Sequence, residues 1–345
     1  MASVKQWFRN ARPTALPQSL MPAILALVLV INQHDFNLIC GLLAVIGVAC
    51  AHLAMNLADD YFDYKVDMHS DRDRIIRKGF RAMSVKYPYL LDGSATLGSL
   101  RKVIAILVIG AVLCGAPVFV YRLLSQGLMG ADGCWWILAV VAATGVLGVF
   151  YSAPPLKLAY RGLGELVIGV IFGPLIMIGV AYSACGSVPS NIIWTSIPVG
   201  MLVLNILYTH SFVEIDSDAA SNKMTFARLM PNRFWRMFVT YVVNLLPFVM
   251  VCGAVLMGLM HPAYVAVVLV LPRALWLCAS LRRFSLGDHS LPSEPPKFLG
   301  KMRDWGPVKE RGIDWFLMRW LTARNTLSGF CGILIIVKVI LLIFV

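Results

Sequence analysis

Nine apolar stretches, each close to the length that crosses a lipid bilayer, dominate this 345-residue chain. A helix needs about 20 mostly apolar residues to span the hydrocarbon core. The chain is 59% hydrophobic and 14% charged, whereas soluble domains carry about 25% charged residues. We therefore predict an all-α, polytopic integral membrane protein with one transmembrane domain over residues 1–345. The nine predicted spans are 16–33, 37–57, 102–121, 134–151, 163–184, 191–209, 236–257, 262–280 and 325–345.

Lysine and arginine residues predict the orientation of these spans. With the N-terminus in the cytoplasm, alternate loops carry nearly all the basic residues, whereas Arg122 alone is clearly placed on the opposite side. Cytoplasmic loops of membrane proteins have this excess. The net charge of +12 is thus spread between apolar runs, and the pattern excludes a compact nucleic-acid-binding surface. We take the first apolar run as a retained span, with a cleaved signal peptide as the alternative.

The longest predicted cytoplasmic loop covers residues 281–324. Its first half is rich in proline, and its second half holds Trp305, Trp315, Phe316 and Trp320 among basic residues. Aromatic and basic residues mixed in this way are typical of an interfacial amphipathic segment. A solvated linker with a membrane anchor is the alternative.

A group of acidic residues follows the second span. Asp60, Asp63 and Asp67 are spaced i, i+3, i+7, so a continuing helix places them on one face. Asn56 lies one turn earlier on that face, and Asp59 sits beside it. Clustered carboxylates repel one another unless a cation binds, and oxygen ligands favour Mg²⁺ joined to substrate phosphates.

A second acidic group follows the sixth span on the same side. His210, Glu214 and Asp218 are spaced i, i+4, i+8, with Asp216 nearby. Two such groups facing each other could hold two cations around a pyrophosphate. A solvated loop face that balances nearby arginines is the alternative, although ionisable residues so close to membrane spans are typically functional.

Three segments resemble one known family. The segment DDYFDYKVD (59–67) resembles the (N/D)DxxDxxxD motif of the UbiA superfamily of intramembrane prenyltransferases. Residues 11–22 and 151–182 resemble the branch that prenylates 1,4-dihydroxy-2-naphthoate in menaquinone synthesis. The resemblance implies nine helices bundled around a central cavity open to the cytoplasmic face. It also implies Mg²⁺, an allylic polyprenyl diphosphate donor, an aromatic acceptor and a bacterial inner membrane.

The resemblance also assigns roles to single residues. It implies that Asn56 is a supporting polar group that helps to bind substrate. The acids that it implies bind metal are Asp59, Asp60, Asp63, Asp67, Glu214 and Asp218. Three positions depart from the family's second motif. His210 stands where the family has Asn or Asp, Val213 where the naphthoate branch commonly has Arg, and Glu214 where Asp is usual. At such a position His210 would hydrogen-bond phosphate, since histidine is a poor ligand for Mg²⁺.

Basic and aromatic residues near the same membrane surface complete the predicted site. Asp60, Asp63 and Lys157 are the predicted catalytic residues. Lys157 and Arg161 would neutralise diphosphate charge, as a point charge and as a fork respectively. Tyr151 would contact the aromatic acceptor, while Arg12 and Lys223 are further candidates for binding diphosphate.

Two other functions stay open at the level of sequence. The altered second motif leaves room for a prenyltransferase-like protein with another acceptor or no activity. A membrane transporter is the third possibility, but transporters place ionisable groups or broken helices near the bilayer midplane. Here the acids gather at one surface, which favours the enzyme.

Overall fold

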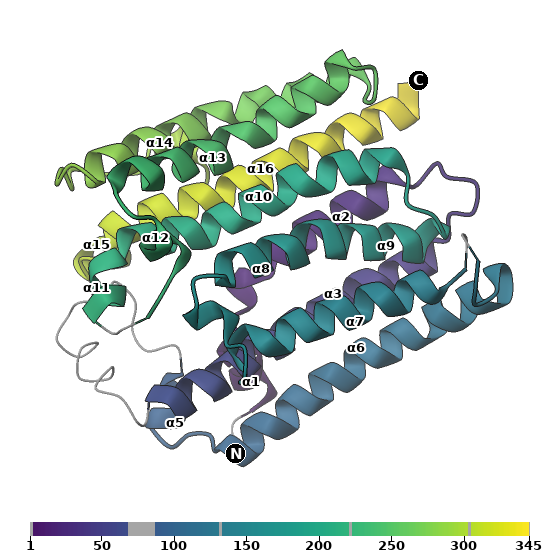
Figure 1. Ribbon diagram of the computed structural model, residues 1–345, viewed down its shortest axis with the longest axis horizontal. Coiled ribbons are helices and arrows are strands. Elements are labelled where there is room, and N and C mark those ends of the chain that lie inside the picture. Colours follow the sequence, from purple (N-terminus) through teal and green to yellow (C-terminus); the bar gives the residue numbers. More distant parts are fainter. Residues whose placement is uncertain (1–2, 68–86, 131–132, 221–222, 303–304, 345) are drawn as a thin grey trace.

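The computed structural model is a bundle of helices, and it describes residues 3–67, 87–130, 133–220, 223–302 and 305–344. Within those ranges the only β-pairing is an isolated bridge between Arg161 and Met224. The long helices lie side by side, with the N-terminus at one end of the bundle and the C-terminus at the other (Figure 1). The predicted all-α class is confirmed.

Eight of the described helical stretches are long and apolar enough to cross a membrane. They are α3 (Leu38–Asp67), α6 (Leu97–Gln126), α7 (Trp135–Ser152), the stretch Gly164–Cys185, α10 (Ser190–Val213), α13 (Arg233–Leu256), the stretch Pro262–Phe284 and α16 (Asp314–Phe344). Each overlaps one of the predicted spans, because sustained apolar composition is the property that both a bilayer and the sequence pattern select.

The first predicted span, 16–33, forms a shorter helix than expected. After α1 (Val4–Asn10) and the 3₁₀ turn η1 (Pro13–Ala15), helix α2 covers Pro17–Leu29, a length of 13 residues. At 1.5 Å per residue this is about 20 Å, short of a hydrocarbon core of about 30 Å. Residues 32–37, which are polar apart from Phe36, follow the helix. The ninth pass therefore stays a prediction.

Two of the membrane-crossing stretches are composite. The stretch Gly164–Cys185 consists of α8 (Gly164–Val170), a π-helical turn η3 (Ile171–Leu175) and α9 (Ile176–Cys185). Pro174 lies in the π turn, where the widened backbone accommodates a residue without an N–H. The stretch Pro262–Phe284 begins as the 3₁₀ helix η4 (Pro262–Val270) and continues as α14 (Leu271–Phe284).

The last helix begins earlier than predicted. Helix α16 starts at Asp314 and not at 325, so Trp315, Phe316 and Trp320 belong to it. The hydropathy pattern left residues 314–324 out of the span because Arg319 lies among them, yet the Arg319 side chain is fully buried. Its guanidinium donates to the Ser280 hydroxyl at 3.0 Å and lies over the Phe284 ring. The interfacial position of segment 281–324 stays a prediction.

Short helices lie in the connections between the long ones. They are α5 (Pro88–Leu91), η2 (Leu158–Tyr160), α11 (Ile215–Ala220), α12 (Phe226–Leu229), η5 (Lys297–Leu299) and α15 (Trp305–Glu310). Helices α3 and α10 run in the same direction, so their C-terminal ends reach the same end of the bundle as α5, α11 and α12 (Figure 1).

Helix α10 lies at the centre of the bundle, and close contact with α8 and η3 fixes its position. In its most apolar window 72% of the residues are buried, against 6% in α6 and in α7, which line the outside. Gly169 and Gly173 face Ser196 and Gly200 across the contact. Membrane helices approach closely where small residues meet at such four-residue spacing.

Substituting Gly173 with Ala tests this contact. A Cβ at this position would lie 2.6 Å from the backbone nitrogen of Gly200 and 2.7 Å from the carbonyl oxygen of Ser196, so the helices must separate. Forced overpacking typically costs 1–3 kcal/mol. We expect Gly173→Ala to lower the midpoint of thermal unfolding in detergent by several degrees. Gly145→Ala is the control, because a Cβ there meets nothing within 4 Å; equal midpoints for the two variants would contradict the close contact.

Candidate active site

The predicted acidic group occupies the last turns of α3. Asp60 is fully buried and Asp63 is 4% exposed, while Asn56 and Asp59 are half-buried beside them. Asp67 is the last residue of α3, and its side chain lies outside the described residues. Buried carboxylates are unfavourable unless charge or hydrogen bonds compensate them, so the partners of these acids define the site.

Arg12 supplies the compensating charge. Its guanidinium lies 3.1 Å from Asp60 Oδ1 and 3.8 Å from Asp59 Oδ2, and it donates to the Asn56 carbonyl at 2.7 Å. The Asn56 amide in turn donates to the Ala11 carbonyl at 3.0 Å. Burial alone would lower the pKa of Arg12, but the carboxylates, Asp60 foremost, raise it above its ordinary value. Arg12 therefore stays charged and fastens the N-terminal segment to α3.

Three hydroxyl groups also bond the α3 acids. Tyr89 of α5 donates to Asp60 Oδ2 at 2.7 Å, Ser152 at the end of α7 donates to Asp59 Oδ1 at 2.7 Å, and Tyr160 of η2 donates to Asp63. Burial and the neighbouring Asp60 raise the pKa of Tyr89, so its hydroxyl keeps the proton that it donates. Elements far apart in the chain thus converge on one helix end.

The second acidic group lies where α10 gives way to α11. Glu214 and Asp218 are buried, at 3% and 2% exposure, whereas Asp216 is exposed. The backbone amides of Glu214 and Asp218 bond four residues back, so both acids keep helical spacing with His210. His210 Nε2 lies 3.1 Å from Glu214 Oε2, and its ring packs edge-on against Phe316. His210 therefore contacts a predicted metal ligand.

Glu165 is a buried acid that sequence reasoning missed. It lies in the first turn of α8 with 4% exposure. Its Oε1 accepts a hydrogen bond from the Ser211 hydroxyl, next to His210, and another from the Phe226 backbone amide at 3.1 Å. A carboxylate at the start of an apolar run reads as an ordinary helix N-terminus, so only its burial identifies its role. Glu165 holds the second acidic segment against α8.

One loop between α7 and α8 contacts Asp63 on α3 and Met224, which follows the second acidic segment. Tyr160 bonds Asp63 on α3, and the neighbouring Arg161 forms the isolated bridge with Met224, which follows the second segment. The Arg161 side chain donates to the Pro155 carbonyl at 3.2 Å within the loop, after a cis peptide bond between Pro154 and Pro155. The loop therefore brings the two segments into one neighbourhood at the same end of the bundle (Figure 1).

The remaining predicted site residues, Lys157, Tyr151 and Lys223, lie in or next to the loop and the acidic segments. Lys157 is a half-buried member of the loop with a left-handed backbone, at φ 44°. Tyr151 is half-buried within electrostatic reach of Asp59, Glu165 and Asp63. The Lys223 amide donates to the Asp218 carbonyl at 2.9 Å, which ties Lys223 to the second segment.

The acids suit a hard cation, but they do not form a complete cage for one. Among the described residues, no group of three or more His, Cys, Asp or Glu side chains is arranged to hold a metal ion. Mg²⁺ usually binds one or two carboxylates and completes its coordination with water and substrate phosphates. The carboxylates of α3 and of the second segment fit that incomplete donor set, with Asp60 engaged by Arg12 and Tyr89.

Comparison with known proteins shows which family this chain resembles. A family model described as the UbiA prenyltransferase family matches residues 19–295. A 2-carboxy-1,4-naphthoquinone phytyltransferase from Synechocystis sp. is 35% identical over 89 residues, 26% of this chain and 29% of that protein. A 1,4-dihydroxy-2-naphthoate octaprenyltransferase from Bacillus subtilis is 25% identical over 228 residues, 64% of this chain and 65% of that protein. The matches thus span less than two thirds of both relatives.

A solved structure has the same fold. It is a UbiA homologue from Archaeoglobus fulgidus bound to DMAPP and Mg²⁺, with a TM-score of 0.52, 14% identity, and coverage of 95% of this chain and 98% of that chain. The likeness extends over nearly the whole bundle. Because the family model also matches most of the sequence, this chain belongs to the UbiA prenyltransferase family.

Proposed function

We propose that this protein transfers a polyprenyl group from an allylic polyprenyl diphosphate to 1,4-dihydroxy-2-naphthoate, with Mg²⁺ as its cofactor. The observation that carries the proposal is the burial of Asp60 and Asp63 at a helix end, beside a loop that also pairs with Met224 after the second acidic segment. The naphthoate acceptor is supported by the relative from Bacillus subtilis, and Mg²⁺ by the homologue from Archaeoglobus fulgidus.

The two acidic segments would hold the diphosphate through the cation. When bound, Mg²⁺ would neutralise the negative charge that develops on the leaving diphosphate. Asp59, Asp60, Asp63 and Asp67 would supply candidate ligands from α3, and Glu214 and Asp218 from the second segment, with each Mg²⁺ taking one or two of these carboxylates. Lys157 and Arg161 on the intervening loop would bind the diphosphate oxygens, with Arg12 and Lys223 as further cationic groups.

The reaction itself would be an electrophilic substitution. The bond between the allylic carbon and the diphosphate oxygen breaks, and a ring carbon of the acceptor forms the new bond to the prenyl group. Loss of a proton, or of the acceptor's carboxylate as carbon dioxide, restores the aromatic ring. Tyr151 would contact the acceptor ring, and a central cavity between the helices would keep water from the allylic cation.

This function belongs at a membrane surface. The prenyl chain partitions into the bilayer, while the diphosphate needs a polar site at its edge. We propose that the acidic end of the bundle faces the cytoplasm, together with the N-terminus, in a bacterial inner membrane. Most basic residues of the loops are predicted on that side.

Replacing Asp63 with Asn tests the site and the reaction together. With a polyprenyl diphosphate, Mg²⁺ and 1,4-dihydroxy-2-naphthoate, wild-type membranes should form the prenylated product and release pyrophosphate. Because the variant lacks a charge that holds the cation, its turnover should fall at least about 100-fold. Asp288→Asn, which changes an exposed carboxylate hydrogen-bonded by Ser290, serves as the control.

The same assay with a panel of aromatic acceptors tests the acceptor. Turnover with another ring and none with the naphthoate would overturn the acceptor assignment alone. Near-normal turnover by Asp63→Asn would overturn the assigned role of the α3 acids. Absence of pyrophosphate release by wild-type protein with every acceptor would overturn the transferase itself.

Glu165 provides a second test, because it acts on the site through hydrogen bonds. Glu165→Ala leaves the Phe226 amide and the Ser211 hydroxyl without their buried acceptor, which typically costs about 1–3 kcal/mol. We expect lower turnover and a lower unfolding midpoint. Glu165→Gln keeps an accepting oxygen and should retain most of both. If Gln abolished turnover at an unchanged midpoint, the carboxylate charge would be needed in the reaction and the positioning role would be wrong.

A further inference from the structure

A groove on the outer face of α13 and α14 lies apart from the acidic helix ends. It has a volume of about 500 Å³ and is lined by Asn232, Arg233, Phe234, Met237, Tyr241, Arg282, Ser285 and Leu286. A second groove of about 430 Å³ shares Tyr241, Arg282 and Leu286 with it and continues along the helices to Leu275 and Cys278. Neither groove is the predicted central cavity, which stays a prediction.

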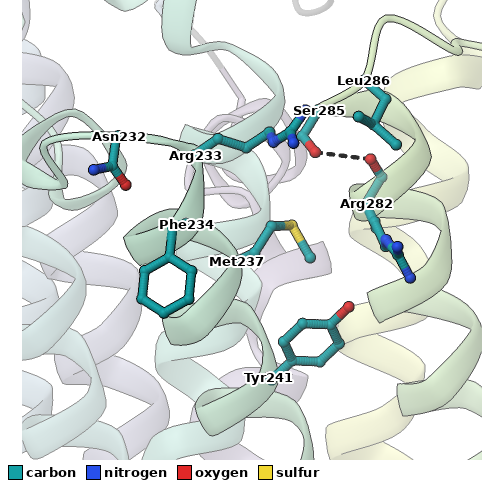
Figure 2. Close-up of a pocket in the computed structure, with 8 residues that line it drawn as sticks. All are labelled: Asn232, Arg233, Phe234, Met237, Tyr241, Arg282, Ser285 and Leu286. Atoms are coloured by element: carbon teal, nitrogen blue, oxygen red, sulfur yellow. Dashed lines mark hydrogen bonds between the residues drawn. The ribbon is translucent and has the colours of Figure 1, made fainter.

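Two arginines from different helices face this groove. In Figure 2 the Arg233 side chain, from the first turn of α13, extends toward Ser285. The Arg282 side chain, from the last turn of α14, lies above Tyr241. Both side chains are exposed, and neither forms a hydrogen bond or a salt bridge with any residue that the structure describes. Two unneutralised guanidinium groups at one groove favour an anionic ligand.

Backbone groups add to the positive potential at the same place. Helix α13 is 24 residues long and starts at Arg233, so the positive end of its dipole lies beside the part of the groove that Asn232 and Arg233 line, although the Asn232 side chain already accepts from the Trp235 amide. Phosphate groups bind at such helix N-termini, where backbone N–H groups are free.

The lower part of the groove is apolar. Met237 and Tyr241 lie one and two turns below Arg233 on α13, and Leu275 lies about two turns below Arg282 on α14. Tyr241 and Leu275 are 38% and 49% exposed. Both helices belong to membrane-crossing stretches, so the two arginines lie at headgroup level and the apolar wall extends toward the hydrocarbon core.

We infer that this groove binds an anionic phospholipid, with its phosphate held by Arg233 and Arg282 and one acyl chain along Tyr241 and Leu275. Charge selects the headgroup, and the apolar wall distinguishes a lipid from free phosphate. None of the groove residues belongs to the acidic segments or to the loop between them, so the inference stands apart from the proposed function.

Native mass spectrometry of the full-length protein in a neutral detergent tests this inference. The probes are dioleoyl phosphatidylglycerol, dioleoyl phosphatidylcholine and inorganic phosphate. We expect wild-type protein to retain phosphatidylglycerol in preference to phosphatidylcholine, and inorganic phosphate not to displace it. The double variant Arg233→Gln and Arg282→Gln should bind phosphatidylglycerol about 30-fold more weakly, since each basic residue near anionic lipid contributes about a factor of five.

Two further variants make the result specific. The control, Arg101→Gln with Lys102→Gln, removes the same charge from exposed positions at the start of α6, at the same end of the bundle, and should bind as the wild type does. Arg233→Lys with Arg282→Lys keeps the charge and should retain most binding. Equal retention of both lipids, equal binding by wild type and the Gln variant, or displacement of the lipid by inorganic phosphate would each overturn the inference.

Discussion

The structure depends on a set of carboxylates held in the interior at the end of a membrane helix. Asp60 is fully buried, and a buried carboxylate that loses its partner typically costs 3–5 kcal/mol. Arg12 and Tyr89 compensate it, Ser152 bonds Asp59, and Tyr160 bonds Asp63. Because these partners come from four separate elements, the need to satisfy the acids also determines how the N-terminal segment, α5, the end of α7 and the following loop are arranged.

Small residues in the middle of the bundle determine how the two acidic segments are set relative to each other. Gly173 and Gly200 let the composite helix approach α10 closely, and Glu165 on α8 then binds Ser211 and Phe226 around the second segment. From the same end of this composite helix, the preceding loop reaches Asp63. The apolar core and the polar site are therefore parts of one arrangement, in which helix spacing controls the separation of charged groups.

The sequence predicted the features that depend on local composition. Hydropathy located eight of the membrane-crossing helices, and helical spacing placed Asp60 and Asp63 on one helix end. The sequence did not predict features that depend on contacts between residues far apart in the chain. Arg319 made the first turns of α16 look polar, although Ser280 and Phe284 stabilise its buried side chain. The ion pair between Arg12 and Asp60 joins residues far apart in the chain. Glu165 resembles an ordinary acidic residue in the first turn of a helix until its burial is known.

In the proposed reaction, carboxylates from both segments share Mg²⁺ over a prenyl diphosphate. Calorimetric titration of Mg²⁺ into protein saturated with a non-reactive prenyl diphosphate analogue tests it most directly. We expect Asp63→Asn on α3 and Asp218→Asn on the second segment each to weaken Mg²⁺ binding at least about tenfold relative to wild type. Wild-type affinity in either variant would contradict the claim, because the cation would then be held by one segment alone.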